Sequence, residues 1–489
     1  MLQRGHNSAT PLVMAAMIAV TLLGAFLRFY HLGLQSLWLD ELASWSLSKN
    51  VGVLPYLLDR ARYDPHPPGY QILLIFVERY LGDSETVLRL PSAMAGTIAI
   101  PVLFALGRRM YSARVGLSVA LLLAVSWAPI YFSQEARSYT FTLLATLVTF
   151  LLWFPLFASQ HGRVTAPRRW TIAYAAAAIV LLYLHYYGML IVFGQALAAL
   201  WLLRGSRKDL RRLLITYGLV LLAFLPWLLV SLYEYRQYRQ SWITRPDAGF
   251  FLSYLRFAFN EKQAFALLAA LAVLAFAVLA LWRRRRQGDQ APFFREDAIL
   301  LGWLLFPAVV TYLVSVIGTP LLVTRYLIIV LPAVYLIVAR VLAQLPVPPL
   351  AKTVILLVLA SAILADLTLR MGYYTYPSKE QFREAVGYVV QNDNSGTLPL
   401  VIAFPWNPAF FDYYFERQGS RLRTDILGGK EQDIASVQQA LGASKAERIW
   451  YIRAHDAADP AFLAFLQQDL RLIDRHEFLG ADVWLFERN

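Results

Sequence analysis

The chain runs repeatedly through apolar stretches about 20 residues long, the length that an α-helix needs to cross a hydrocarbon core about 30 Å thick. With 58% hydrophobic and only 16% charged residues among 489, it departs strongly from the composition of soluble globular domains. We therefore expect an α-helical polytopic membrane protein with about eleven transmembrane helices. The expected spans lie near 11–30, 86–107, 114–132, 138–157, 170–185, 187–203, 213–233, 263–282, 297–317, 324–343 and 353–370.

Positive charge predicts the orientation of these helices, because short loops rich in Lys and Arg stay in the cytoplasm. Such loops alternate along the chain, so we expect a cytoplasmic N-terminus and a retained first helix. The net charge of +13 is then explained by topology rather than by nucleic-acid binding. The cytoplasmic side receives Arg4, Arg108, Arg109, Arg114, Arg163, Arg168, Arg169, the stretch from Arg204 to Arg212, the run from Arg283 to Arg286, and Lys352, while the other side receives 31–85, 133–137, 234–262, 318–323 and everything after 370.

One apolar stretch, which begins HPPGY and continues QILLIFVERYLG, is too short to be counted with these spans. From Pro67 to Leu81 it makes a helix of about 22 Å at 1.5 Å per residue, less than a membrane core requires. Counting it as a span would also place every later loop on the opposite side of the membrane, against the distribution of Lys and Arg. We therefore expect a juxtamembrane helix, or a re-entrant one, within a long first external loop.

The character of the sequence changes after Arg370, where apolar runs shorten to the length of strands and polar helical stretches separate them. Strands alternating with helices favour a small α/β layer. We predict two domains, a transmembrane domain over 1–370 and a soluble extracytoplasmic α/β domain over 371–489. Strands are expected at 398–404, 448–454 and 481–487, and helices at 378–392, 407–418 and 460–468.

The first external loop contains two groups of ionisable residues. Asp40 and Glu41 fall in LWLDELASWSLSKN, whose apolar spacing is typical of a helix lying at the membrane interface, where lipid phosphates reside. The alternative is a solvated acidic pair at a helix start. Asp64 and His66 follow in DPHPPGY, and a carboxylate beside an imidazole serves proton transfer or metal binding. A proline-rich helix start is the alternative there.

Later external segments add further charges. YFSQEARSYT places Glu135 and Arg137 between two spans, where charge is costly unless it is paired or functional, so either a salt pair or a polar site is expected.

Arg325-Tyr326 begins an apolar helix without a nearby acid, which suits phosphate binding, with snorkelling to the headgroups as the alternative. Loop 234–262 carries Arg236, Arg239 and Arg245 among aromatics, either for a sugar or anionic headgroup or as a solvated loop.

Five motifs in this order resemble the GT-C superfamily, in the bacterial branch related to protein O-mannosyltransferases and lipid A aminoarabinose transferases. They are WLDE, HPPGY, LRLPS, SQEARSY and TRYLIIVLP, and the resemblance covers most of residues 1–345. It implies a glycosyltransferase of a bacterial or archaeal cytoplasmic membrane. Such an enzyme takes a sugar from a polyprenyl-phosphate donor and transfers it, with inversion, to a hydroxyl of a glycan, lipid or protein acceptor outside the membrane.

The resemblance also assigns roles to residues. It makes Asp40 the general base, gives Glu41, His66 and Glu135 the task of shaping the site or holding a divalent cation, and gives Arg325 that of neutralising the departing lipid phosphate. Tyr326 and Arg137 would assist in binding that phosphate. The metal candidates are Asp40, Asp64, His66 and Glu135, and the chain departs from the aminoarabinose branch by lacking a glutamate beside its His-Pro.

Two other functions are compatible with the sequence. A polysaccharide polymerase or ligase would share the external chemistry but use lipid pyrophosphate donors. A non-enzymatic lipid or sugar transporter would place its site at the bilayer midplane on repeated halves, whereas the chain has no internal repeat and its ionisable residues gather on one side. For the domain after 370 we expect acceptor recognition or packing over the active site.

Overall fold

In the computed structural model, the chain forms two compact units. The first unit comprises Met1–Tyr30, Val51–Phe76 and Arg89–Met371, and the second comprises His31–Asn50, Val77–Leu88 and Gly372–Asn489. The second unit therefore combines the C-terminal residues with two pieces of the expected first external loop. The structure describes all residues except 1–9, 158–166, 204–205, 238–242, 289–292, 393–399, 403–407, 419–425, 429–433, 444–445 and 456–458.

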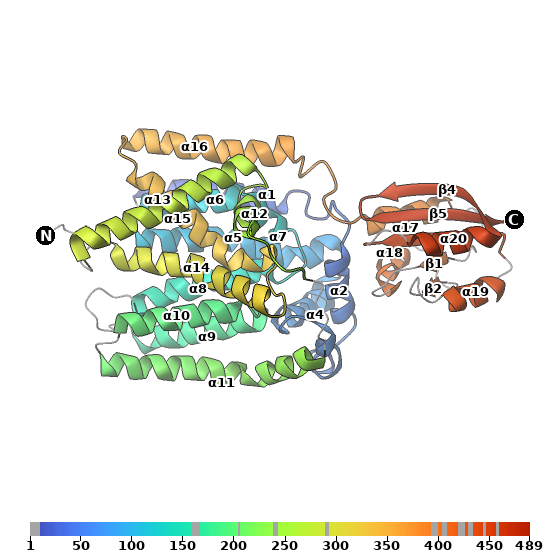
Figure 1. The fold of residues 1–489 in the computed structure, drawn as a ribbon, viewed down its shortest axis with the longest axis horizontal. Coiled ribbons are helices and arrows are strands. Elements are labelled where there is room, and N and C mark those ends of the chain that lie inside the picture. Colours follow the sequence, from blue (N-terminus) through green and yellow to red (C-terminus); the bar gives the residue numbers. More distant parts are fainter. Residues whose placement is uncertain are drawn as a thin grey trace. The chain divides into compact units, whose positions relative to one another are not determined.

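The first unit is a bundle of helices (Figure 1). Two of its helices, α4 and α5, continue into the second unit. The short α4 confirms that a helix follows HPPGY, and it is 13 residues long. The helices are α1 (Pro11–Phe29), α3 (Val53–Pro55), η1 (Tyr56–Arg60), η2 (Ala61–Tyr63), α4 (Gly69–Leu81), α5 (Glu85–Met110), α6 (Ala113–Val125), α7 (Trp127–Ser133), α8 (Tyr139–Phe157), α9 (Arg168–Leu184), α10 (Gly188–Leu203), α11 (Arg207–Gln237), α12 (Phe250–Ala258), α13 (Gln263–Gln287), α14 (Phe294–Ile317), η4 (Thr324–Val330), α15 (Leu331–Gln344), α16 (Pro349–Ala365) and η5 (Asp366–Arg370).

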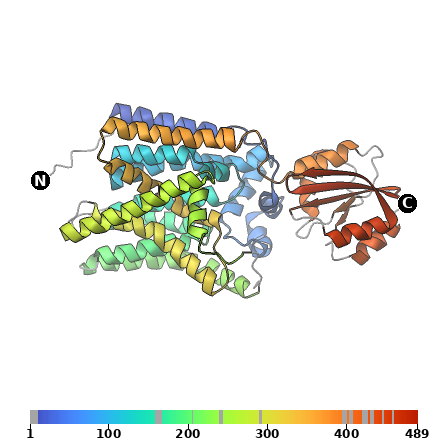
Figure 2. The ribbon, with the colours of Figure 1, turned by 45° about the horizontal axis from the view of Figure 1, so that its top comes forward.

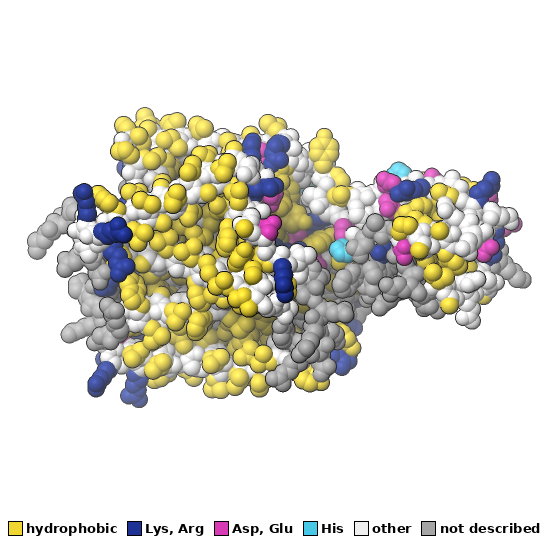
Figure 3. All heavy atoms as spheres, viewed as in Figure 1, with side chains coloured by type: hydrophobic (Ala, Val, Ile, Leu, Met, Phe, Trp, Pro, Cys, Tyr) yellow, Lys and Arg dark blue, Asp and Glu magenta, His cyan; other side chains and the backbone are white. Residues whose placement is uncertain are grey.

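Within the described residues, eight helices are long and apolar enough to cross a membrane, or nine if the bent pair α6 and α7 is one span. The expected number of eleven is not confirmed, because α9 and α10 have only 17 and 16 residues. Hydrophobic side chains cover most of the visible face of the bundle, with many of the Lys and Arg side chains near its ends (Figure 3). This distribution is that of a multi-pass membrane protein.

Helices α5 and α6 pack closely because glycine removes a side chain where they meet. A Cβ atom added to Gly116 would lie 2.6 Å from the carbonyl oxygen of Phe104 and 3.1 Å from the backbone nitrogen of Arg108. Both are backbone atoms that no side-chain rotation can move. We expect Gly116→Ala to lower the free energy of unfolding by about 1–3 kcal/mol, measured by thermal unfolding in detergent.

Gly218 supplies the matched control, because nothing lies within 4 Å of a Cβ atom added there and it also lies inside a helix. Gly218→Ala should leave stability unchanged or raise it by about 1 kcal/mol, since alanine favours helix. Equal unfolding temperatures for Gly116→Ala and wild type would refute the close packing.

The second unit contains a five-stranded mixed sheet with strand order β2-β1-β3-β5-β4. β1 pairs in parallel with β2 and β3, whereas β5 pairs antiparallel with β3 and β4. Helices lie on both faces of the sheet (Figure 2). The elements are α2 (Leu39–Ser48), α17 (Phe382–Asn392), β1 (Leu400–Ile402), η6 (Pro408–Phe410), α18 (Asp412–Arg417), β2 (Ile426–Gly428), α19 (Ile434–Ala443), β3 (Arg448–Ala454), α20 (Pro460–Asp469), β4 (Leu470–Phe478) and β5 (Ala481–Arg488).

Side chains alternate between the two faces of this sheet, as the pleat requires. Tyr451 stacks on Trp484 at 4.6 Å between ring centroids, on the face that packs against α19 and α20. The neighbouring Trp450 faces Tyr388 of α17 instead, at 6.2 Å. The predicted α/β layer is therefore confirmed, and its three expected strands correspond to β1, β3 and β5, although parts of the range 398–404 lie outside the described residues.

Candidate active site

A break in one helix shapes the centre of the first unit. α6 and α7 meet at 60° where a continuous span over 114–132 was expected. The break frees backbone groups, and two distant polar side chains bind them. Arg28 donates hydrogen bonds to the carbonyl oxygens of Leu123 (2.9 Å) and Ala124 (3.2 Å), and Asn260 accepts one from the N–H of Trp127 (2.9 Å). Because these groups are satisfied, the chain can turn within an apolar bundle.

The turn after α7 carries the residues of the SQEAR motif. Gln134 Nε2 donates hydrogen bonds to the carbonyl oxygens of Arg28 (3.1 Å) and Tyr30 (2.9 Å), which fixes the turn to the end of α1. Glu135 is fully buried. Arg137 is also buried, with 9% of its surface exposed, so both charges of this motif lie inside the unit rather than on its surface.

Arg137 lies against His66, which comes from the DPHPPGY segment. Its Nη2 atom is 3.3 Å from His66 Nδ1 and 3.4 Å from His66 Nε2. Asp64 contacts the same histidine, since its Oδ1 atom lies 3.1 Å from His66 Nδ1 and accepts the backbone N–H of His66 at 3.0 Å. The structure thus brings together three of the residues that the sequence singled out, from two separate loops.

Aromatic rings surround His66 and connect it to Tyr326. The ring centroid of His185 lies 5.3 Å from that of His66 and 4.9 Å from that of Tyr326. Tyr139 and Tyr187 lie 6.2 Å and 5.4 Å from Tyr326. We call this group the aromatic cluster, and it consists of His66, Arg137, Tyr139, His185, Tyr187 and Tyr326.

Arg325 lies beside the aromatic cluster, at the start of η4. Its guanidinium carbon is 5.7 Å from the ring centroid of Tyr326, and both side chains are half-buried. η4 then leads into α15, whose residues are mostly buried, so Arg325 and Tyr326 sit where a buried helix begins. In loop 234–262, Arg245 is exposed, whereas Arg239 and the side chain of Arg236 lie outside what the structure describes, as do Arg4, Arg163 and Arg204.

Sequence analysis did not identify His185, which lies in the turn between α9 and α10. Its Nδ1 atom accepts the backbone N–H of Tyr187 at 3.2 Å, so the proton of the neutral ring sits on Nε2. That Nε2 atom is buried and has no hydrogen-bond partner among the described residues. In the sequence, the LHYYG segment could have indicated this residue, because a histidine and two tyrosines stand there between apolar runs.

Asp40 and Glu41 belong to the second unit, where they lie in different environments on α2. Asp40 is half-buried. Glu41 is fully buried, and its Oε2 atom lies 3.3 Å from Nζ of Lys379, whose side chain is 2% exposed. Two neighbouring carboxylates therefore differ in access to solvent, and Asp40 is the more accessible.

The residues predicted as metal ligands, Asp40, Asp64, His66 and Glu135, are not confirmed as a metal site. Among the described residues, no three His, Asp or Glu side chains form a group that could hold a metal ion. In addition, the guanidinium of Arg137 lies against both ring nitrogens of His66, which places a positive charge where a cation would bind.

A bundle of apolar helices with one broken span in the first unit and a small mixed sheet in the second are the features of a GT-C type fold, which the solved structures below share. Residues 65–230 match the family model described as dolichyl-phosphate-mannose-protein mannosyltransferase. Together with the solved structures below, this match confirms the resemblance drawn from the five motifs. None of the curated protein sequences matches the chain significantly.

Solved structures match nearly the whole chain. ArnT from Cupriavidus metallidurans in the apo state is 14% identical, with a TM-score of 0.63 and 98% of each chain covered. The same protein bound to undecaprenyl phosphate is 15% identical, with a TM-score of 0.58 and 98% of each chain covered. The oligosaccharyltransferase AglB from Archaeoglobus fulgidus, in complex with an inhibitory peptide and a dolichol-phosphate, is 12% identical, with a TM-score of 0.53, 97% of this chain and 74% of AglB covered.

Proposed function

We propose that this protein is an inverting glycosyltransferase that moves a sugar from a polyprenyl-phosphate donor to a hydroxyl acceptor on the extracytoplasmic face. In the reaction, the acceptor oxygen bonds to the anomeric carbon while the bond from that carbon to the phosphate oxygen breaks. Asp40 takes the hydroxyl proton, and the polyprenyl phosphate leaves with the electron pair. An inverting displacement of this kind needs a base for the acceptor and positive charge for the leaving group.

The observation that carries the proposal is the aromatic cluster together with Arg325 beside it. Arg137 and Arg325 offer guanidinium groups, which bind phosphate with paired hydrogen bonds, and the tyrosine and histidine rings between them offer apolar faces and polar tips. Two of the structurally similar proteins hold a polyprenyl phosphate, undecaprenyl phosphate in ArnT and dolichol-phosphate in AglB. A lipid phosphate is therefore the ligand that best suits this group.

His185 joins the proposed donor site through its Nε2–H group. A buried donor without a partner costs free energy unless a ligand accepts its hydrogen bond. We expect His185→Phe, which keeps the ring but removes the donor, to weaken binding of undecaprenyl phosphate by about tenfold or more, since a hydrogen bond to a charged group contributes about 1.5–3 kcal/mol. Tryptophan-fluorescence titration of purified protein checks this, with the unfolding temperature as the folding control. Unchanged affinity would remove His185 from the site.

The direct test of the proposed function is transfer of radiolabelled sugar by the purified protein to membrane-derived acceptors. Polyprenyl-phosphate and polyprenyl-pyrophosphate donors should be compared side by side. Transfer from the monophosphate alone supports the proposal. Transfer from the pyrophosphate donor alone would point to a polymerase or ligase, and absence of transfer with every donor would favour a transporter.

A further inference from the structure

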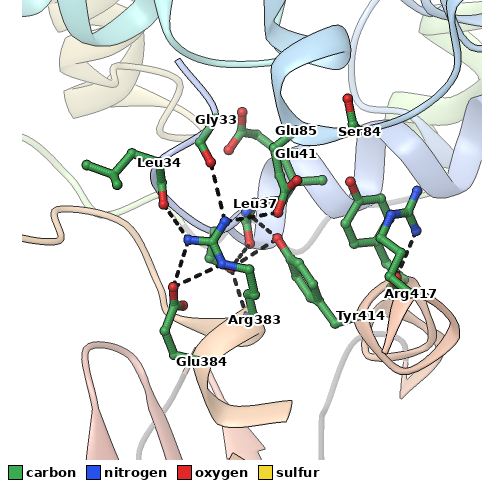
Figure 4. Close-up of polar contacts among 12 residues, drawn as sticks. Gly33, Leu34, Leu37, Glu41, Ser84, Glu85, Arg383, Glu384, Tyr414 and Arg417 are labelled. Atoms are coloured by element: carbon green, nitrogen blue, oxygen red, sulfur yellow. Dashed lines mark hydrogen bonds and ion pairs between the residues drawn. The ribbon is translucent and has the colours of Figure 1, made fainter. Parts of the chain in front are cut away.

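The N-terminus of α2, directly before Asp40, is capped by residues from the C-terminal part of the second unit. The first N–H groups of a helix have no partner within the helix. Here the N–H of Leu39 donates to Glu380 Oε2 at 2.9 Å. The preceding N–H, of Leu37, donates to the hydroxyl of Tyr414 at 2.6 Å (Figure 4). Residues more than 300 positions away in the sequence therefore satisfy the start of this helix.

Lys379 also holds the start of α2, because it forms an ion pair with Glu41. Glu41 Oε2 accepts the N–H of Trp38 at 3.4 Å and lies 3.3 Å from Lys379 Nζ. Both charged side chains are almost completely buried, with exposed fractions of 0% for Glu41 and 2% for Lys379. Each charge compensates the other in a place that water does not reach, so losing one would leave the other buried without that opposite charge beside it.

Arg383 holds the chain segment that leads into α2. It donates hydrogen bonds to the carbonyl oxygens of Gly33 and Leu34, and it pairs with Glu85 at 3.2 Å (Figure 4). Its backbone N–H donates to Ser36 Oγ at 3.1 Å. Together with Tyr414, Arg383 of α17 thus holds the connection between α1 and α2.

The far end of α2 is held as well. Trp45 Nε1 donates to Asp83 Oδ2 at 2.9 Å, and Arg417 of α18 pairs with Asp83 Oδ1 at 2.5 Å. Burial raises the pKa of Asp83, but the hydrogen bonds from Arg417 and Trp45 outweigh it and hold that pKa below its ordinary value. Asp83 stays ionised and keeps both contacts at neutral pH.

We propose that Glu41 and Lys379 are a positioning pair, through which the C-terminal domain fixes the start of α2 and so aims the Asp40 carboxylate. This inference rests on the proposed function in one respect, the role of Asp40 as base. Glu41 itself is too deeply buried to meet a substrate, whereas Asp40 on the next position is accessible. The C-terminal domain therefore takes part in the proposed catalysis without supplying a reacting group.

Three variants test the pair. Lys379→Met keeps the length of the side chain but removes the positive charge beside the Glu41 carboxylate. Glu41→Gln keeps the Lys379 ammonium group but removes the negative charge beside it. The double variant Lys379→Met/Glu41→Gln removes both charges, and its amide can still accept the Trp38 N–H. We expect each single variant to lower kcat by about tenfold or more, with the donor KM changed by less than about threefold, and the double variant to recover to within about threefold of wild type.

Lys49→Met is the matched control, because it removes an ion pair between the residue that caps the C-terminus of α2 and Glu416 of α18. The Lys49–Glu416 pair is 3.0 Å long but 29% and 27% exposed. Exposed pairs contribute little to stability, so kcat should stay within about twofold of wild type.

Hydrogen exchange of the amides in 39–48 provides a readout that does not depend on activity. Faster exchange in Lys379→Met, reversed in the double variant, supports the positioning role. Wild-type kcat in Lys379→Met would overturn it. So would a double variant with wild-type exchange but the kcat of the single variants, since the charges would then act in the chemistry. If the wild-type protein transfers no sugar, the proposed function fails while the exchange experiment still decides on the pair.

Discussion

Asp40→Asn is expected to reduce kcat by about 100- to 10,000-fold, the range that a positioned general base contributes. The amide keeps the shape of the side chain but cannot take the acceptor proton. Donor binding should be retained, because the lipid phosphate is assigned to side chains of the aromatic cluster and Arg325. Transfer of radiolabelled sugar gives kcat, and equilibrium binding of undecaprenyl phosphate gives the donor affinity.

Asp59→Asn is the matched control for this substitution. Asp59 lies in the same predicted loop but is exposed, and it forms an ion pair of 2.9 Å with the exposed Arg62. Its replacement should leave kcat within about twofold, since exposed ion pairs have small effects. If Asp40→Asn transferred sugar at the wild-type rate, another residue would have to be the base.

Arg325→Ala is expected to weaken the donor by about 10- to 100-fold, because a charge-assisted hydrogen bond contributes about 1.5–3 kcal/mol. The rate should fall too, since the same guanidinium would neutralise charge that develops on the leaving phosphate. Arg325→Lys should recover only part of the affinity, because an ammonium group cannot form the paired hydrogen bonds. Titration with undecaprenyl phosphate at fixed ionic strength measures both variants.

Arg245→Ala controls for the loss of a positive charge as such. Arg245 is exposed in loop 234–262 and has no assigned role in the donor site. Its removal should change donor affinity by less than about threefold, because salt screens exposed charges. Equal losses in Arg245→Ala and Arg325→Ala would mean that overall charge, and not a phosphate site at Arg325, governs donor binding.

The residues assigned to the proposed chemistry come from both units of the chain. The groups assigned to the lipid phosphate, Arg137, His185 and Arg325, belong to the first unit. The proposed base Asp40 and its positioning pair belong to the second. The roles of Asp40, Arg137 and Arg325 remain predictions, whereas the contacts that hold α2 and the aromatic cluster are features of the structure.

Local sequence was sufficient to predict the apolar helices and the buried strands, because a short run of residues specifies each of them. Runs of apolar residues encode membrane helices because every turn of such a helix faces lipid or apolar neighbours. The short α4 was separated from them by its length and by the alternation of the positively charged loops. Strands β3 and β5 were found because they are buried and rich in aromatic and branched residues. β4 was missed, because it is an edge strand whose mostly exposed residues give no apolar alternation.

Only the tertiary structure revealed where buried polar groups find their partners. The bend between α6 and α7 depends on Arg28 and Asn260, which lie far away in the sequence. The same holds for Glu41, whose sequence neighbours suggested a site residue but whose partner Lys379 is 338 positions distant. Hydrophobic periodicity repeats along the chain, so a short window of sequence is enough to predict a helix or a strand. A single buried charge needs one specific partner, and only folding brings that partner to it.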